Sequence, residues 1–221
     1  MESYDFSYTL LPYMLRIISQ LDNAKAELKR ICDRTHDTQV SEKESTVREI
    51  IEAVRQKGDE ALLHYTEKFD RQTLTSQTMR VDGAQMDAAY QQISQSLLKA
   101  IQTACKNIEA FHRQRVPSSW VTFEDNGVVL GKRYTPVEKA GIYVPGGRAS
   151  YPSTVMMNAI PARVAGVSRI VMMTPIGAEG ALSSAVLVAA QESGIEEIYQ
   201  VGGAQAIAAL AYGTETIPNV D

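Results

Sequence analysis

The sequence lacks the features that mark several large classes of protein. Only two of its 221 residues are cysteines, Cys32 and Cys105, which excludes a disulfide framework or a CxxC metal knuckle. No apolar run reaches the roughly 18 residues that a membrane-spanning helix needs. The first eight residues include Glu2 and Asp5 but no basic residue, unlike a secretory signal peptide. We therefore expect a cytoplasmic protein with reduced thiols and no membrane partner.

Positive charge and histidine are also scarce. The formal net charge is −4, which argues against a basic surface for nucleic acid. The three histidines, His36, His64 and His112, all lie in the first 112 residues, and no two of them have the spacing of metal ligands. We expect no nucleic-acid partner and no metal ligands in this sequence. The remaining composition, 44% hydrophobic and 22% charged, is that of an ordinary globular protein.

The composition changes near residue 127. Twelve of the 14 glycines but only 13 of the 48 charged residues lie from Gly127 onward. Before that point apolar residues recur at helical spacing, and one long helical stripe is predicted from residue 86 to residue 111. Segments 120–123 and 128–134, joined through Asp-Asn-Gly, predict a β-hairpin. We divide the chain into an N-terminal helical segment (1–40), a helical and hairpin part (41–135) and an α/β part (136–221).

The α/β part repeats one pattern three times. Short β segments at 141–144, 169–174 and 197–201 are each followed by glycine or proline. A helix-compatible stretch comes next in each case, at 153–165, 181–193 and 204–211. Strand, turn and helix in this order predict βαβ units, with a parallel sheet buried on both faces. The predicted fold class is therefore α/β, with a ligand at the carboxyl ends of the strands.

Glycine-rich turns are predicted at that edge of the sheet. The pair Gly202-Gly203 precedes a helix whose free N–H groups suit a phosphate, and Gln205 is placed to hydrogen-bond a ribose or an amide. The pair Gly146-Gly147 follows Tyr143, whose hydroxyl is positioned to meet a ligand. A tight turn and a core tyrosine explain the same residues without any ligand, so both alternatives stay open. Neither a G-x-G-x-x-G motif nor a P-loop is present.

Longer motifs resemble one known family. They are Gly141-Ile-Tyr-Val-Pro-Gly-Gly147, Asn158-Ala-Ile-Pro-Ala-Arg-Val-Ala-Gly166 and Val201-Gly-Gly-Ala-Gln-Ala-Ile-Ala-Ala-Leu-Ala-Tyr-Gly-Thr-Glu-Thr-Ile-Pro218, and they resemble histidinol dehydrogenase. The resemblance is dense over residues 132–221 and looser through the helical part. It implies a Rossmann-like parallel layer in an aldehyde-dehydrogenase-like fold. It also implies a zinc-dependent homodimer that oxidises L-histidinol to L-histidine in two NAD-dependent steps of histidine biosynthesis.

The resemblance assigns roles to particular residues. It implies that Tyr143 and Gln205 contact NAD, and that the two glycine pairs form backbone turns beside it. The family's zinc ligands, substrate-binding serine and acid–base pair would lie beyond Asp221. We therefore expect no catalytic residue and no zinc ligand within this sequence, and no turnover from this chain alone.

Two other interpretations remain open from the sequence. The first is a non-catalytic nucleotide-binding or interaction module derived from the same family. The second is an unrelated α/β phosphate-binding protein, although only one basic residue, Arg148, adjoins the glycine turns. If the chain is a plain fragment, its third strand is expected to leave an open sheet edge that promotes aggregation.

Overall fold

The computed structural model describes residues 17–32, 38–146, 150–177 and 180–221. The chain forms two compact units, Met1–Thr46 and Val47–Asp221. In the first unit, the helix α1 (Leu21–Cys32) has no buried residue. The helix α2 (Thr38–Lys57) begins in the first unit and contributes Ile50 and Val54 to the core of the second. Everything that positions the candidate site lies in the second unit. The three-part division of the chain stays a prediction.

A three-stranded parallel sheet forms the centre of the second unit. Its strands β3 (Lys139–Tyr143), β4 (Arg169–Met173) and β5 (Glu197–Tyr199) lie side by side in that order. The helices α6 (Pro152–Val164) and α7 (Ser184–Glu192) connect the strands, and α8 (Gly203–Tyr212) follows β5. The predicted α/β class and its strand–turn–helix repeats are therefore confirmed.

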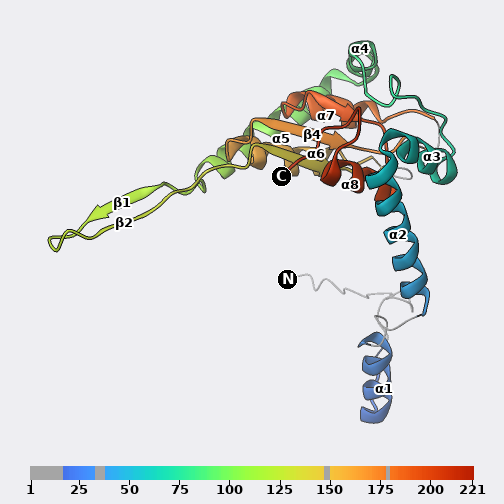
Figure 1. The fold of residues 1–221 in the computed structure, drawn as a ribbon, viewed down its shortest axis with the longest axis horizontal. Coiled ribbons are helices and arrows are strands. Elements are labelled where there is room, and N and C mark those ends of the chain that lie inside the picture. The colour runs from blue at the N-terminus through green and yellow to red at the C-terminus, as the bar shows by residue number, and fades with distance from the viewer. Residues whose placement is uncertain (1–16, 33–37, 147–149, 178–179) are drawn as a thin grey trace, which may run out of the picture. The chain divides into compact units, whose positions relative to one another are not determined.

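The sheet is the middle layer of three (Figure 1). On β4, Ile170 and Met172 belong to one core and Val171 and Met173 to another. Because side chains alternate along a strand, a strand that is apolar throughout builds a core on each side. The first core is covered by α4 (Gly83–Gln92), α5 (Gln95–Arg113), α6 and α7, and the second by α2, α3 (Asp59–Asp70) and α8.

The outer edge of β5 is not open. Residues 79–81 run antiparallel to it, with an isolated bridge between Arg80 and Tyr199. The N–H of Val81 donates to the carbonyl of Ile198 (2.9 Å), and the N–H of Gln200 donates to the carbonyl of Met79 (2.8 Å). The expectation of an open third strand is therefore wrong, because a segment from the helical part covers that edge.

The helical stripe predicted from residue 86 to residue 111 is two helices. α4 ends at Gln92, α5 begins at Gln95, and Ile93 and Ser94 between them are extended. The Ser94 side chain accepts a hydrogen bond from the N–H of Leu97 (3.2 Å) and so caps α5. A serine hydroxyl offers the backbone an alternative to a continuing helix, which apolar spacing alone does not reveal.

The predicted β-hairpin is confirmed. β1 (Trp120–Phe123) pairs antiparallel with β2 (Val129–Lys132), and Gly127 in the connecting turn has φ +84°. All residues of both strands are exposed.

The last residues of the chain pack against the start of α3. The N–H of Asp59 donates to the carboxylate of Glu215 (2.8 Å), and the hydroxyl of Thr216 donates to the carboxylate of Asp59 (2.5 Å). Gly58, with φ +52°, leaves the space that the Glu215 carboxylate occupies. The Thr-Glu-Thr-Ile-Pro motif thus has a structural role, because its hydrogen bonds connect the α/β part to a helix of the helical part.

Candidate functional site

The turns that follow the three strands meet at Pro175. This residue lies in the turn after β4, the middle strand. A Cβ atom built on Gly146 would lie 2.6 Å from the Pro175 carbonyl oxygen, and one built on Gly202 would lie 2.5 Å from Cβ of Pro175. Because backbone and proline ring cannot yield easily, neither position has room for a side chain. The two glycines therefore let three turns form one continuous surface at the carboxyl ends of the strands.

Gly203 begins α8 in a left-handed conformation, with φ +69°. Its N–H donates a hydrogen bond to the hydroxyl oxygen of Tyr143 (3.2 Å), the last residue of β3. The first N–H groups of a helix have no partner within the helix, and the tyrosine oxygen partners one of them here. The Tyr143 hydroxyl still carries a proton and a lone pair for a further partner.

Gln205 lies beneath this turn with its amide unpaired. The side chain is 1% exposed, and neither Nε2 nor Oε1 has a hydrogen-bond partner. A Cβ atom on Gly203 would lie 2.4 Å from Oε1 of Gln205, so the amide touches the turn from below. A buried polar group without a partner costs about 1–3 kcal/mol, and native structures rarely leave one unexplained. A hydrogen-bonding partner at this turn would remove that cost.

Asp70 is a functional candidate that sequence reasoning missed. It is the last residue of α3, and its Oδ2 is buried without a partner. A Cβ atom built on Gly202 would lie 3.5 Å from this oxygen. Burial raises the pKa of this carboxyl above its ordinary value. One signal was available: an acidic residue in the last turn of a helix is disfavoured by the helix dipole. Its approach to Gly202 depends on tertiary packing and could not be read from the sequence.

The structure brings most of the predicted site residues together. Tyr143, Gly146 and the pair Gly202-Gly203 lie at the converging turns, and Gln205 lies directly below them. Gly147, the remaining predicted residue, lies outside the described residues.

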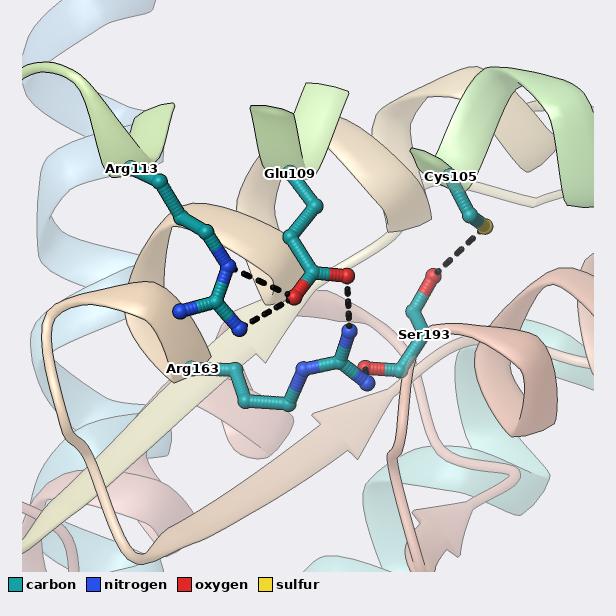
Figure 2. A network of polar contacts seen from close by, with 5 residues as sticks. All are labelled: Cys105, Glu109, Arg113, Arg163 and Ser193. Carbon is teal, nitrogen blue, oxygen red and sulfur yellow. Dashed lines mark hydrogen bonds and ion pairs between the residues drawn. The ribbon is translucent and has the colours of Figure 1, made fainter. Parts of the chain in front are cut away.

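A second polar cluster holds helices together. Figure 2 shows Arg163 of α6 bonded to the carboxylate of Glu109 on α5 (3.2 Å) and to the carbonyl of Ser193 after α7 (3.1 Å). Arg113 shares the same carboxylate, and Arg113 and Arg163 hold the pKa of Glu109 below its ordinary value. Cys105 is buried beside Ser193, and burial raises the pKa of its thiol. A thiol of this kind is a poor nucleophile, and Cys105 is a small residue of the core that lies on one face of the sheet.

The described histidines lie away from the converging turns. His64 is exposed on α3 and packs edge-on against Tyr65, and His112 packs edge-on against Phe111 at the end of α5. His36 lies outside the described residues. Within the ranges that the structure describes, no group of three or more His, Cys, Asp or Glu side chains is placed to hold a metal ion. No helix among those residues is long and apolar enough to span a membrane.

Comparisons with known proteins agree with one another. The model of the family described as histidinol dehydrogenase matches residues 33–221. "Histidinol dehydrogenase 2" of Nostoc sp. is 69% identical over 208 residues, which are 94% of this chain and 48% of that protein. Histidinol dehydrogenase of Synechococcus sp. is 66% identical over 208 residues, with the same coverage. The chain spans about half the length of these curated relatives.

A solved structure supports the same relationship. The crystal structure of histidinol dehydrogenase from Elizabethkingia anophelis superimposes with a TM-score of 0.76 at 39% sequence identity. The superposition covers 80% of this chain and 41% of that one.

Proposed function

The chain belongs to the histidinol dehydrogenase family, and on that basis we propose that the edge formed by β3, β4 and β5 binds NAD. The process to which this binding would contribute is the one the family serves, the oxidation of L-histidinol to L-histidine in histidine biosynthesis. The parallel sheet with helices on both faces supports a Rossmann-like layer within an aldehyde-dehydrogenase-like fold.

The observation that carries the NAD proposal is the unpaired amide of Gln205. It lies in the core against Gly203, in a chain whose other described buried polar side chains nearly all have partners. The nicotinamide ring, when bound, accepts the hydride. The residues of this chain bind and orient it: the Gln205 amide pairs with a polar group of the dinucleotide that reaches the turn, and the Tyr143 hydroxyl contacts the dinucleotide beside it.

Asp70 restricts which part of the dinucleotide meets the Gly202 turn. Oδ2 of Asp70 is buried and unpaired beside Gly202. A phosphate brought to the same place would meet a carboxylate of like charge, whereas a ribose hydroxyl would donate a hydrogen bond to it. The proposal therefore places hydroxyl or amide groups at this turn in preference to the pyrophosphate that the glycines alone suggested.

The described residues do not fit the family's zinc, since no suitable ligand cluster exists among them. No step of the reaction is therefore derived through the metal for this chain. The proposal for the 221-residue chain is cofactor binding, and we expect no turnover with histidinol and NAD.

Titration calorimetry with NAD tests the binding proposal. We expect saturable binding in the micromolar range, weakened about tenfold or more in Gln205→Ala, which removes the proposed hydrogen bond. Gln200→Ala is the matched control, because Gln200 is also buried near the end of β5 but its Nε2 already donates to the Thr78 carbonyl. Equal affinity of the wild type and Gln205→Ala, or no binding by the wild type, would contradict the proposal.

An assay of NADH formation separates the family's activity from the non-catalytic module. Both predict NAD binding, but zinc-dependent NADH production from histidinol would assign turnover to this chain itself.

The resemblance further supports a homodimer, which we propose as the assembled state. Cys105 is a free thiol, which supports a reducing compartment such as the cytoplasm.

A further inference from the structure

Helix α3 packs along α8 and meets the converging turns with only one of its ends. Its first residue, Asp59, contacts the segment that follows α8, and its last residue, Asp70, lies beside Gly202, which precedes α8. The two helices therefore run in opposite directions. A helix of 12 residues is about 18 Å long. Asp70 and the contacts of Asp59 thus lie at opposite ends of one continuous element.

The end of α3 at the converging turns has three unfavourable features. Oδ2 of Asp70 is buried without a partner, and burial raises the pKa of this carboxyl. A carboxylate in the last turn of a helix is also disfavoured by the helix dipole. The next residue, Arg71, has a left-handed conformation (φ +55°), and among the residues that the structure describes it is the only non-glycine with a positive φ. Strain of this kind persists only when contacts elsewhere hold it in place.

The opposite end of α3 is capped by a carboxylate from a distant segment. Gly58 at the N-cap has no side chain to cap the helix, and the N–H of Asp59 donates instead to Oε2 of Glu215 (2.8 Å), 156 residues further along the chain. A Cβ atom on Gly58 would collide with this carboxylate. The hydroxyl of Thr216 in turn donates to the Asp59 carboxylate. We call Asp59, Glu215 and Thr216 the α3 clasp. Its capping charge is favourable, because it meets a free N–H group and the positive end of the helix dipole.

The α/β part fixes the turn that carries Glu215. The N–H of Thr214 donates to the carbonyl of Ile217 (2.8 Å), and the Ile217 N–H donates to the Thr214 hydroxyl (3.0 Å). Ile217 is fully buried in the core that α3 and α8 share. The hydroxyl of Tyr199, the last residue of β5, donates to the carbonyl of Thr216 (3.1 Å). The clasp is therefore anchored to the strand that leads into the converging turns.

We propose that Glu215 is a positioning residue for the cofactor site: by capping α3 at one end, it holds Asp70 beside Gly202 at the other. The favourable contacts of the clasp offset the unfavourable burial of Asp70, which would otherwise move toward water and shift the end of α3. Without the cap, the folded chain loses its buried acceptor at the converging turns. This inference rests on the proposed NAD binding and adds a residue that acts on it from a distance.

Titration calorimetry with NAD on the full chain tests this role. Glu215→Ala should weaken binding about tenfold or more, whereas Glu215→Gln should stay within about threefold of wild type, because its amide oxygen still accepts from the Asp59 N–H. Glu60→Ala is the matched control. Glu60 lies in the same first turn of α3, its side chain is 77% exposed, and its loss changes the net charge equally. This control should leave NAD affinity unchanged.

A purely structural role for Glu215 gives a different result. Glu215→Ala would then lower the urea midpoint but leave the affinity of the folded protein for NAD unchanged, and that outcome overturns the proposal. If Glu215→Ala does not fold, Thr216→Val takes its place. This substitution keeps the side-chain shape but removes the hydroxyl that donates to Asp59, and it should weaken NAD binding in the same direction.

A double-mutant cycle in urea tests the coupling without any ligand. Substitutions as far apart as the two ends of α3 normally have additive effects on stability. Asp70→Asn should raise the urea midpoint of the wild-type chain at neutral pH. In the Glu215→Ala background this rise should shrink by about half or more, because Asp70 there reaches water. Additive effects overturn the proposal, as does an Asp70→Asn substitution that leaves the wild-type midpoint unchanged.

The two experiments separate this inference from the proposed function. A wild-type chain that does not bind NAD overturns the proposed function, while the cycle still decides whether the α3 clasp positions Asp70. Wild-type NAD binding together with additive effects in the cycle supports the proposed function and overturns the positioning role of Glu215.

Discussion

The hydroxyl oxygen of Tyr143 accepts a hydrogen bond from the backbone N–H of Gly203, with 3.2 Å between the two atoms. The bond joins the end of β3 to the start of α8 across the middle strand β4. It uses one of the N–H groups that a helix N-terminus would otherwise present to an anion. A ligand at this edge therefore meets a tyrosine hydroxyl held in place by the helix, in addition to the turn itself.

Tyr143→Phe should lower NAD affinity about tenfold with little effect on folding. The substitution removes the hydroxyl, but the Gly203 N–H is exposed and can donate a hydrogen bond to water instead. The free energy of unfolding should therefore fall by less than about 1 kcal/mol. Calorimetry and urea denaturation measure the two quantities.

The control for this variant is Tyr199→Phe. The Tyr199 ring is 2% exposed, and its hydroxyl donates to the carbonyl of Thr216 (3.1 Å), away from the turn. Its loss should lower stability by about 1 kcal/mol and leave NAD affinity unchanged. If both phenylalanine variants bind NAD like the wild type, Tyr143 has only a structural role.

Gln205→Leu should stabilise the protein while abolishing NAD binding. Leucine has a similar volume, and it removes two buried polar groups that have no partner. Their loss is expected to raise the free energy of unfolding by about 1–3 kcal/mol in the absence of ligand. Urea denaturation with and without NAD checks both parts, since NAD should shift the wild-type midpoint and not that of the variant. A destabilised Gln205→Leu would mean that the amide already has a partner in the folded chain.

The strands and helices of the α/β part were predictable because local chemistry determines them. Each strand has apolar residues, including a β-branched one, after a charged first residue, and glycine or proline marks the turn after it. The break at Ser94 was not predicted because the apolar spacing continues through it. The pairing of Arg80 with Tyr199 and the approach of Asp70 to Gly202 join segments far apart in the chain. Contacts of that kind follow from tertiary packing, which no local pattern records.

Gly203→Ala should destabilise the protein by about 1–2 kcal/mol, since a left-handed backbone conformation disfavours any side chain. The added Cβ atom would also press on the amide of Gln205, so NAD affinity should fall with stability. Gly83→Ala serves as the comparison, because Gly83 begins α4, has no positive φ and has no atom within 4 Å of the added Cβ. That variant should be neutral or slightly more stable in urea denaturation. Equal stability of the two variants would contradict the role assigned to the Gly203 turn.

Asp70→Asn should raise the stability of the ligand-free protein at neutral pH. Burial raises the pKa of Asp70 in the folded state, so its charged form opposes folding at every pH above that folded-state value. As the pH falls from there toward the pKa of the unfolded state, about 3.9, the folded state takes up a proton. The energetic cost of burying the charged carboxylate then disappears. The gain in the free energy of unfolding over wild type should therefore be present at pH 7 and vanish in acid, as measured by urea denaturation across this range.

Glu197→Gln should change the free energy of unfolding at pH 7 in the opposite direction, in the same experiment. Arg169 donates two hydrogen bonds to the Glu197 carboxylate (2.6 and 2.8 Å) and holds its pKa below the ordinary value. Its contribution to stability is present above the unfolded pKa of about 4.3 and is lost as the pH falls through the folded value. Glu197→Gln should therefore be less stable than wild type at pH 7, and Asp70→Asn more stable, with both converging on wild type in acid. If Asp70→Asn is less stable than wild type at pH 7, the Asp70 carboxylate has a favourable partner in the folded chain. Asp70 would then not be an unpaired hydrogen-bond acceptor for a ligand.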